Sequence, residues 1–306
     1  MPRTNPPGAT QLLISLCDVL ASLRQTCLIR MDLLTRRMHW VDIGFDRRVV
    51  ASGKGIALDD ASLFHLSLVR SPEGVDDTFL TVLDRGSFDV VHRQPLPEVR
   101  DGHSLLRHED RLYVASTGTD EVWVYRLDGV RATEPELVWT PTGSGSDTHH
   151  VNSIAMVDGE LCVTAIGPKL EGTWMASRNG YIWNLTRSAE LASGLWQPHS
   201  LTWHEGQFWF CNSQVGTLNA ETGPLVQFTG YSRGLAFVSD GPTFIGTSVG
   251  RRPRNDPLRG HDVFHNPWTG GEPRGRCAVV MISPGGVRTE IGMTDWGSEI
   301  YDLLLV

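Results

Sequence analysis

The sequence predicts an all-β protein, a six-bladed β-propeller closed by pairing the C-terminal strand with N-terminal strands. Of 306 residues, 32 are glycine and 10 are tryptophan, which suits many short strands joined by tight turns. A pattern of polar residue, short strand, acidic or glycine turn and second strand recurs about every 50 residues, the period of a propeller blade. The last copy of this pattern holds a single strand, so its partners must come from elsewhere in the chain.

The repeat is clearest in HSLLRHEDRLYV (103–114), NSIAMVDGELCV (152–163) and HSLTWHEGQFWF (199–210). KGIALDD, RGLAFVSDG and EIYDLLLV fit the same frame. The six copies begin at Lys54, His103, Asn152, His199, Arg233 and Glu299, with separations of 49, 49, 47, 34 and 66 residues. We attribute the longest separation to an insertion at 250–276, rich in Pro, Gly and Arg. No interdomain linker appears, so one domain spanning 1–306 is expected.

The N-terminus is expected to supply the strands that the last copy lacks. These strands are predicted at 12–18, 26–33 and 38–44, in one blade with 299–306, which leaves no free end around the ring. The apolar stretch from Leu12 is interrupted by Asp18. It is therefore too short for a membrane span and a poor signal-peptide core.

Composition excludes several function classes. A net charge of −8 argues against a general nucleic-acid binder, which needs a basic surface. The five cysteines form no CxxC pattern, which argues against a disulfide framework or a structural zinc site and favours the cytoplasm. We expect a small-molecule substrate, no nucleotide cofactor, no nucleic acid and no membrane. A protein partner stays unknown.

The six leading residues are predicted to form a ring, because the innermost strands of a propeller line its channel and begin on one face. Six polar side chains around a narrow space need partners, water or a ligand. A structural reading remains open, since propeller channels are commonly wet. The mixed charges and the histidines favour a binding site.

Without a metal, the ring suits proton transfer on a small anionic metabolite. Arg233 and Lys54 would hold a carboxylate or phosphate, with Asn152 completing the contacts. His103 and His199 would act as acid and base, and Glu299 would orient or polarise one of them. Such a set suits elimination, epimerisation or cyclisation.

In the alternative hypothesis, the ring holds a divalent metal ion. His103 and His199 could ligate it together with His150 or Glu299. His150 lies two residues before Asn152 and is expected on the same side, with His149 facing away. The nearby cationic ring members would disfavour a metal ion.

Loops on the same face can complete the pocket. The segment 167–179 and the insertion 250–276 follow second strands and return to this face. Asn212 and Ser213, at the end of another second strand, are expected close by. The candidate loop contacts are Lys169, Trp174, His261, His265 and Trp268. His108 and His204 fall at the opposite end of their strands and are interpreted as surface turn residues.

The second half of the chain resembles an uncharacterised bacterial family of the domain-of-unknown-function kind, predicted to be propellers. The motifs that carry it are VNSIA (151–155), GYIW (180–183), GLWQPHSLTW (194–203), WFCNS (209–213), YSRGLAF (231–237) and EIYD (299–302). The resemblance implies the fold and no particular reaction. More distantly, the architecture is similar to gluconolactonases, strictosidine-synthase-like proteins, and peptide-amidating and streptogramin lyases. The lactonases would need an all-oxygen ligand set, which His103 and His199 do not fit.

The leading hypothesis is an enzyme of the lyase, isomerase or cyclase type, in biosynthesis, acting at the channel mouth. Hydrolysis is disfavoured because the sequence sets no serine or cysteine nucleophile beside a histidine. Two alternatives stay open: a non-catalytic scaffold whose insertion docks a partner, and a metal-dependent, lactonase-like hydrolase.

Overall fold

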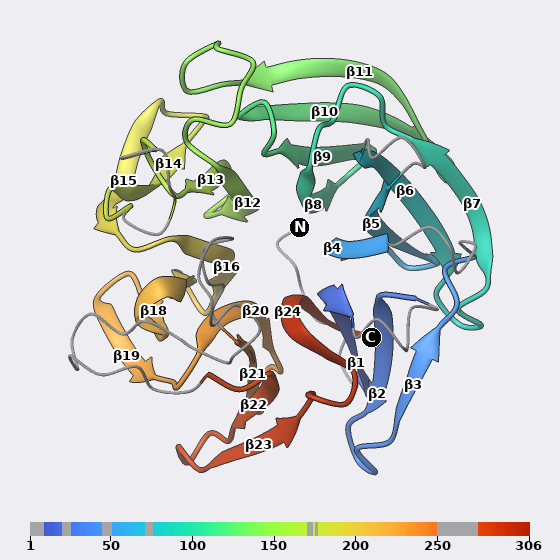
Figure 1. Ribbon diagram of the computed structural model, residues 1–306, viewed down its shortest axis with the longest axis vertical. Helices are drawn as coiled ribbons and strands as arrows, with labels where there is room; N and C mark the ends of the chain where they lie inside the picture. The colour runs from blue at the N-terminus through green and yellow to red at the C-terminus, as the bar shows by residue number, and fades with distance from the viewer. Residues whose placement is uncertain are drawn as a thin grey trace, which may run out of the picture.

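Six antiparallel sheets are arranged as blades around one axis in the computed structural model (Figure 1). It describes residues 9–19, 26–44, 51–70, 76–169, 174, 177–249 and 275–306. Each sheet has four strands, and the single helical element among these residues is the 3-10 turn η1 (Ser213–Val215). The predicted fold class is confirmed.

The first blade consists of β4 (Ala51–Leu58), β5 (Ser62–Arg70), β6 (Asp76–Asp84) and β7 (Val90–Pro95). The second consists of β8 (Gly102–His108), β9 (Arg111–Ser116), β10 (Glu121–Asp128) and β11 (Arg131–Trp139). The third consists of β12 (Val151–Val157), β13 (Glu160–Ala165), β14 (Gly180–Asn184) and β15 (Ala189–Leu195). The fourth consists of β16 (Pro198–His204), β17 (Gln207–Asn212), β18 (Thr217–Ala220) and β19 (Gly223–Gln227). The fifth consists of β20 (Tyr231–Phe237), β21 (Thr243–Ser248), β22 (Ala278–Ile282) and β23 (Arg288–Gly292).

The closing blade joins the two ends of the chain, as predicted. Its inner strand is β24 (Gly297–Leu305), followed outward by β1 (Gln11–Val19), β2 (Leu28–Asp32) and β3 (Met38–Val41). Leu12 pairs with Leu305 and Ser15 with Asp302 across the junction. The ring therefore depends on backbone hydrogen bonds between the first and last strands of the chain.

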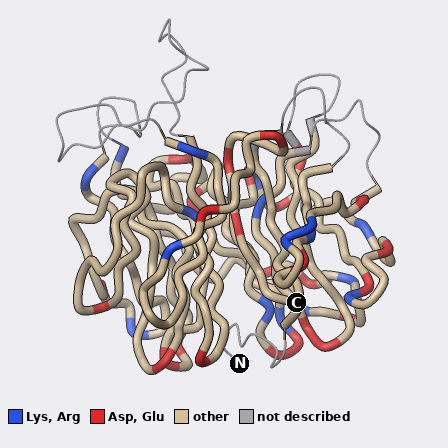
Figure 2. Tube along the Cα trace, turned by 90° about the horizontal axis from the view of Figure 1, so that it is seen from below, with Lys and Arg blue, Asp and Glu red and all other residues tan. Residues whose placement is uncertain are grey.

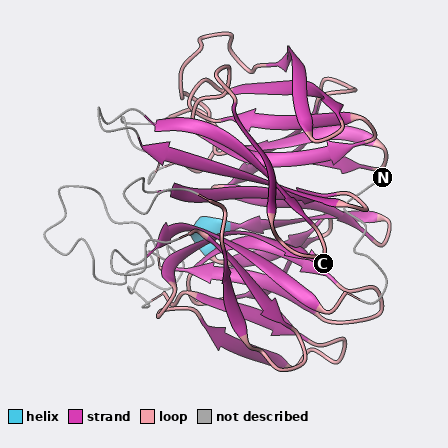
Figure 3. Ribbon diagram, turned by 90° about the vertical axis from the view of Figure 1, so that its right-hand side faces the viewer, coloured by secondary structure: helices cyan, strands magenta, loops and turns pink. Residues whose placement is uncertain are grey.

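The apolar core lies between neighbouring blades. Phe64 and Leu80 of the first blade pack with Leu105 and Val114 of the second, all fully buried. Similar clusters fill the other five junctions. In the edge-on view the strands run across the disc from face to face (Figure 3). Burial between blades therefore stacks them side by side and leaves the strand ends at the two faces.

The surface carries both signs of charge. Lys and Arg are interspersed with Asp and Glu over the side seen in Figure 2. No helix in the described part of the chain is long and apolar enough to cross a membrane.

The inner strands lose regular pairing where the predicted ring residues lie. Pairing with the second strand shifts between Gly53 and Ile56 in β4, and between Gly102 and Leu105 in β8. It shifts between His199 and Thr202 in β16, and corresponding shifts occur in β12, β20 and β24. Such bulges release backbone N–H groups from the ladder and redirect side chains.

The released N–H groups are taken by the preceding blade. Ser104 Oγ accepts a hydrogen bond from Ile154 N at 3.2 Å, and Ser153 Oγ accepts one from Leu201 N at 3.2 Å. The same contact recurs from Gly234 N to Ser200 Oγ (2.8 Å), from Ile300 N to Ser248 Oγ (2.9 Å) and from Ile56 N to Asp302 Oδ2 (3.0 Å). These bonds tie neighbouring blades around the channel.

At the junction between the first and second blades, backbone packing replaces the hydrogen bond to a serine side chain. Gly55 occupies the position that serine fills in the next three blades, and a Cβ there would meet Leu105 N at 2.6 Å and Ser104 Cα at 2.8 Å. Backbone therefore lies directly against backbone, and only glycine fits without displacement of a blade.

Substituting Gly55→Ala is expected to lower the free energy of unfolding by about 1–3 kcal/mol, as overpacking against a rigid neighbour does. Gly292→Ala is the control, because a Cβ at that strand position meets nothing within 4 Å. Urea unfolding measures both variants. Equal stabilities for the two variants would contradict the close blade contact.

Candidate functional site at the mouth of the central channel

The six predicted ring residues lie in the six inner strands, one per blade, and each is at most 5% exposed. Their side chains come from β4, β8, β12, β16, β20 and β24, the strands nearest the axis in Figure 1. The ring residues are Lys54, His103, Asn152, His199, Arg233 and Glu299. Buried polar groups are costly unless paired, so their partners decide what the ring can do.

Tyr301 lies at the centre of the ring, two residues after Glu299 on β24. Its ring centroid is 5.2 Å from Lys54 Nζ, 5.2 Å from Arg233 Cζ and 5.4 Å from the His103 ring centroid. Contacts to three different blades place this phenol on the axis. Burial raises its pKa well above the usual value, so it stays neutral. The ring is therefore the polar mouth of a channel that Tyr301 fills.

Both ring histidines are held in the same way. His103 Nδ1 lies 2.8 Å from the Asp101 carbonyl oxygen, and His199 Nδ1 lies 2.8 Å from the Gln197 carbonyl oxygen. A carbonyl can only accept, so Nδ1 carries the proton and Nε2 presents a lone pair. Asp101 (φ 49°) and Gln197 (φ 57°) adopt left-handed backbone conformations. This strained turn sets the orientation of both imidazoles.

Burial keeps both imidazoles neutral. It lowers the pKa of His199 well below the usual value, and the positive charge of Arg233 adds to the effect. Burial likewise lowers the pKa of His103, although Asp101 opposes it. At neutral pH each ring histidine is therefore a neutral hydrogen-bond acceptor at Nε2.

The cations of the ring are paired with carboxylates. Arg233 Nη2 lies 3.2 Å from Glu299 Oε2, and Lys54 Nζ lies 3.3 Å from Asp101 Oδ1. Burial alone would raise the pKa of Asp101, but electrostatic interactions with His103 and Lys54 outweigh it and hold that pKa below its usual range. The two ion pairs bring the charge of the ring close to zero. The sequence analysis did not identify Asp101. Its position two residues before His103 was the one signal in the sequence that could have pointed to it.

Asn152 presents an acceptor without a protein partner. Its Nδ2 donates to the Pro198 carbonyl oxygen at 3.2 Å, which fixes the orientation of the amide. Oδ1 is buried and accepts no hydrogen bond from the described residues. Asn152, His199 and Tyr301 line a cavity of about 20 Å³, enough for about one water.

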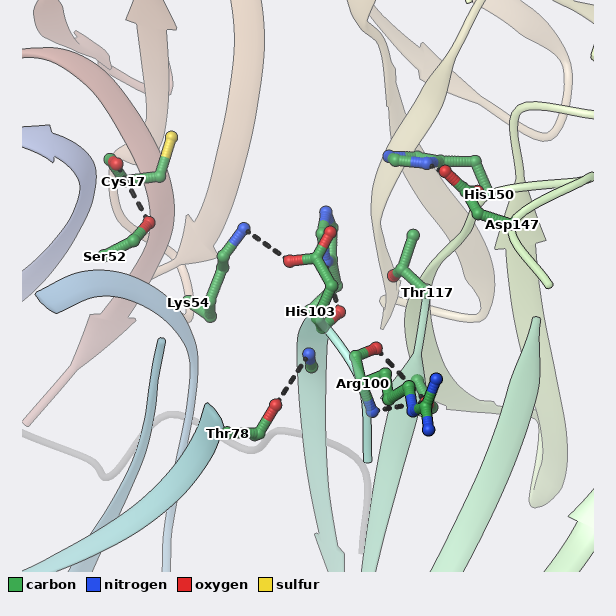
Figure 4. A network of polar contacts seen from close by, with 12 residues as sticks. Cys17, Ser52, Lys54, Thr78, Arg100, His103, Thr117, Asp147 and His150 are labelled. Carbon is green, nitrogen blue, oxygen red and sulfur yellow. Dashed lines mark hydrogen bonds and ion pairs between the residues drawn. The ribbon is translucent and has the colours of Figure 1, made fainter. Parts of the chain in front are cut away.

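His150 approaches the ring from the loop before β12. Its Nδ1 lies 3.0 Å from Asp147 Oδ1, and its ring centroid is 5.1 Å from that of His103. Figure 4 shows His150 on the side of His103 opposite to Lys54, with its ring toward His103. Asp120 Oδ2 fixes the loop by accepting from Thr148 N at 2.6 Å, among other bonds.

His149 faces away, as the alternation predicts. Its Nδ1 lies 3.0 Å from the hydroxyl of Tyr181 on β14. His204, at the far end of β16, stacks on Phe237 at 4.2 Å, so this turn residue also packs against the next blade. His108 ends β8 in the same way.

The loop between β13 and β14 reaches the ring at Trp174. The indole ring centroid lies 5.0 Å from that of His150, and the Trp174 carbonyl accepts from Gln197 Nε2 at 2.7 Å. Gln197 Oε1 in turn accepts from the Tyr231 hydroxyl at 2.6 Å. Lys169 Nζ lies 4.9 Å from the Trp174 ring. Gln197 and Tyr231 were missed by sequence reasoning, although both also precede ring residues by two positions.

Asn212 and Ser213 have structural partners. Asn212 Oδ1 accepts from Trp196 N at 2.7 Å, so its side chain holds a loop. Ser213 Oγ lies 2.9 Å from His199 Nδ1 and donates to the Ser232 carbonyl at 2.6 Å. A serine does therefore lie beside a histidine, contrary to the sequence-based statement. It faces the protonated nitrogen, which cannot activate it as a nucleophile.

The predicted metal set does not form a ligand cluster in this structure. Among the described residues, no three His, Cys, Asp or Glu side chains are grouped so that they could hold a metal ion. The predicted ligands therefore do not form a site that fits a divalent metal ion. They are His103 and His199 with either His150 or Glu299. The remaining predicted contacts, His261, His265 and Trp268 of the insertion 250–276, lie outside the described residues.

The sequence family follows from residues 101–306, which match a family described as "Domain of unknown function (DUF4915)". The chain belongs to the DUF4915 family. This agrees with the resemblance carried by the motifs between residues 151 and 302. A comparison of this DUF4915 protein with curated proteins found no match.

Solved propellers share the fold of this DUF4915 chain. A chain of a nidogen/laminin complex is 11% identical with a TM-score of 0.59, covering 97% of each chain. A putative 6-phosphogluconolactonase from Bacteroides fragilis is 11% identical with a TM-score of 0.55, also covering 97% of each. Regucalcin from Agrobacterium tumefaciens, a calcium-binding protein, is 13% identical with a TM-score of 0.50, covering 82% of this chain and 74% of its own. At these identities the likeness shows the fold alone.

Acid is expected to destabilise the protein through its buried histidines. Burial lowers the pKa of His65 to about 3, and His103 and His199 are lowered by the same cause. Unfolded histidine titrates near pH 6.5. Below that pH the unfolded chain binds more protons, so the stability present above about pH 6.5 is lost as pH falls.

Below about pH 6 the free energy of unfolding should fall by about 1.4 kcal/mol per pH unit through His65, and the other two buried imidazoles should add to that slope. Urea unfolding as a function of pH measures the slope. His65→Gln should reduce the slope by about one proton, because glutamine does not titrate. An unchanged slope in this variant would contradict the neutral, buried state of His65.

Proposed function

We propose that this propeller binds a small anionic metabolite at the ring and acts on it by proton transfer, as a lyase, isomerase or cyclase. The observation that carries the proposal is the pair of neutral imidazoles with Nε2 lone pairs in one ring with Arg233 and Lys54. His103, His199 and Glu299 are the proposed catalytic groups. Lys54, Asn152, Arg233 and Trp174 are the proposed contacts to the substrate, whereas Asn212 serves a loop.

An anionic group has a physical reason to bind here. The two ion pairs leave the ring nearly neutral, so a ligand carboxylate or phosphate can share Arg233 and Lys54 with their present partners. Arg233 also lies over Tyr231 at 4.7 Å, which orients the guanidinium. Asn152 Oδ1 can accept from a hydroxyl or amine of the same ligand, which removes the cost of its unpaired burial.

Binding of an anion prepares the histidines for proton transfer. A negative charge close to an imidazole favours its protonated form and raises its pKa. His103 or His199, neutral in the free protein, then becomes a stronger base toward a proton beside a carbonyl group. Glu299, which already accepts from Cys17, can polarise the ligand or receive a second proton.

The alternatives rest on less. The putative 6-phosphogluconolactonase and the calcium-binding regucalcin are similar to this chain in fold, but a lactonase-like metal hydrolase needs a ligand cluster that the described residues do not form. A scaffold function would require the polar ring to be structural. The five free cysteines agree with a cytoplasmic protein, which we include in the proposal.

A panel of small carboxylic acids, each beside its neutral amide, tests the proposal by thermal unfolding. Binding acids should raise Tm by mass action, by an amount equivalent to about 2.7 kcal/mol at a hundred times Kd, and the amides should not. Arg233→Lys should weaken the effect, because it removes the planar fork. His199→Gln should preserve binding and abolish turnover, a loss of about 10²–10⁴-fold for a proton-transfer group.

The scaffold alternative predicts a different pattern. Ring variants would then behave as the parent in a cellular complementation assay, whereas deletion of 250–276 would abolish function. Arg288→Gln serves as a control for the loss of a positive charge, because Arg288 lies on β23 away from the ring, where it donates to the Gln227 carbonyl. A ring that binds neither acids nor amides would overturn the proposed function.

A further inference from the structure

Cys17 brings a thiol to the ring from a strand that is not an inner strand. It lies on β1, and its backbone carbonyl accepts from Ser52 Oγ of β4 at 2.9 Å. Figure 4 shows this hydrogen bond between Ser52 and Cys17, which joins the two neighbouring blades. Cys17 is partly exposed, whereas Cys27, Cys162, Cys211 and Cys277 are buried, and none of the five forms a disulfide.

The thiol belongs to a cluster with a base and a cation. Cys17 Sγ donates to Glu299 Oε2 at 2.7 Å, a short contact for a sulfur donor. Arg233 Nη1 lies 4.0 Å from the same sulfur, and Arg233 Nη2 lies 3.2 Å from Glu299 Oε2. A nucleophile, a proton acceptor and a charge-stabilising group therefore meet within the ring, which is the arrangement of an activated thiol.

We propose that Cys17 is a nucleophile of this site and adds to an electrophilic carbon of a bound anionic ligand, with Glu299 as its base and Arg233 stabilising the developing charge. This goes beyond proton transfer. It rests on the proposed function for the anionic character of the ligand, and Arg233 and Glu299 take part in both.

The step balances for an α,β-unsaturated acid. Glu299 takes the thiol proton while the sulfur electron pair forms an S–C bond at the β-carbon. The π electrons of the double bond move to the α-carbon, which then receives the proton from Glu299. Nothing is oxidised or reduced and no further reactant is consumed. The reverse direction is an elimination, the type of chemistry that the ring histidines suit.

The other cysteines provide an internal contrast. Burial raises the pKa of Cys27, Cys162 and Cys211 to about 12, and Cys277 is 1% exposed. These four thiols are buried, so they should stay unmodified in the folded protein.

Alkylation followed by peptide mass spectrometry tests the proposal without a known substrate. With iodoacetamide, the S–C bond forms as iodide leaves. At pH 6, Cys17 should react about a hundredfold faster than the thiol of a short peptide, the lower end of what a positioned proton acceptor contributes. The four buried cysteines should stay unlabelled, and Cys17→Ser should abolish labelling.

Glu299→Gln decides whether the carboxylate is the base. Its removal should return the rate toward that of the peptide thiol, while Glu290→Gln, an exposed carboxylate on β23, should leave the rate unchanged. A rate that is unchanged or faster in Glu299→Gln would overturn the proposal, because it would mean that the carboxylate does not act as a base and at most repels the thiolate.

The pH profile of the unmodified protein gives a second test should Glu299→Gln unfold. The rate should stay high from pH 8 down to about pH 6, and a rate that instead tracks thiolate formation near pH 8.5 would also overturn the proposal.

Comparing iodoacetate with iodoacetamide separates this inference from the proposed function. If the ring attracts anions, the ratio of their rates should be higher at Cys17 than at the peptide thiol. If the ratio equals that of the peptide thiol but Glu299→Gln strongly slows alkylation, the anion-binding proposal is wrong and the proposal that Cys17 is a nucleophile stands. If the ratio is high but Glu299→Gln leaves the rate unchanged, the anion-binding proposal stands and the proposal that Cys17 is a nucleophile is wrong.

Discussion

The bulge in each inner strand is the constraint on which the fold and the site both depend. Where the strand gives up regular pairing with its own blade, its N–H turns to the neighbouring blade, as from Leu201 to Ser153 or from Ile56 to Asp302. The same irregularity directs one polar side chain per blade toward the axis. Blade-to-blade adhesion and the polar ring therefore have a single structural cause, and a change in one disturbs the other.

The ring then has to satisfy its own polar groups in a space that water barely enters. Left-handed turns at Asp101 and Gln197 point carbonyls at the two imidazoles, and two carboxylates offset Arg233 and Lys54. These contacts fix the tautomers and the charge state before any ligand arrives. Preorganisation of this kind lowers the cost of binding, because the side chains lose little further freedom.

Much of the fold and of the ring could be predicted because each copy of the sequence repeat corresponds to one blade. Aligning copies by period and alternation placed Lys54, Asn152 and the other ring members in inner strands, and the single-strand last copy implied closure with the N-terminus. The supporting residues were missed because their type varies from blade to blade. Tyr301 reaches the axis through its place after Glu299, and Cys17 reaches the ring only because closure brings β1 beside β24. The predicted metal set failed as a cluster because sequence spacing says nothing of distances across the channel.

Nitrogen-15 NMR of the imidazoles tests the central claim most directly. The shifts of Nδ1 and Nε2, assigned with His103→Gln and His199→Gln, report which nitrogen carries the proton. Both ring histidines should be neutral at pH 7 with the proton on Nδ1, donated to Asp101 and Gln197. A proton on Nε2, or a doubly protonated ring at that pH, would contradict the account, because the channel would then present no basic nitrogen.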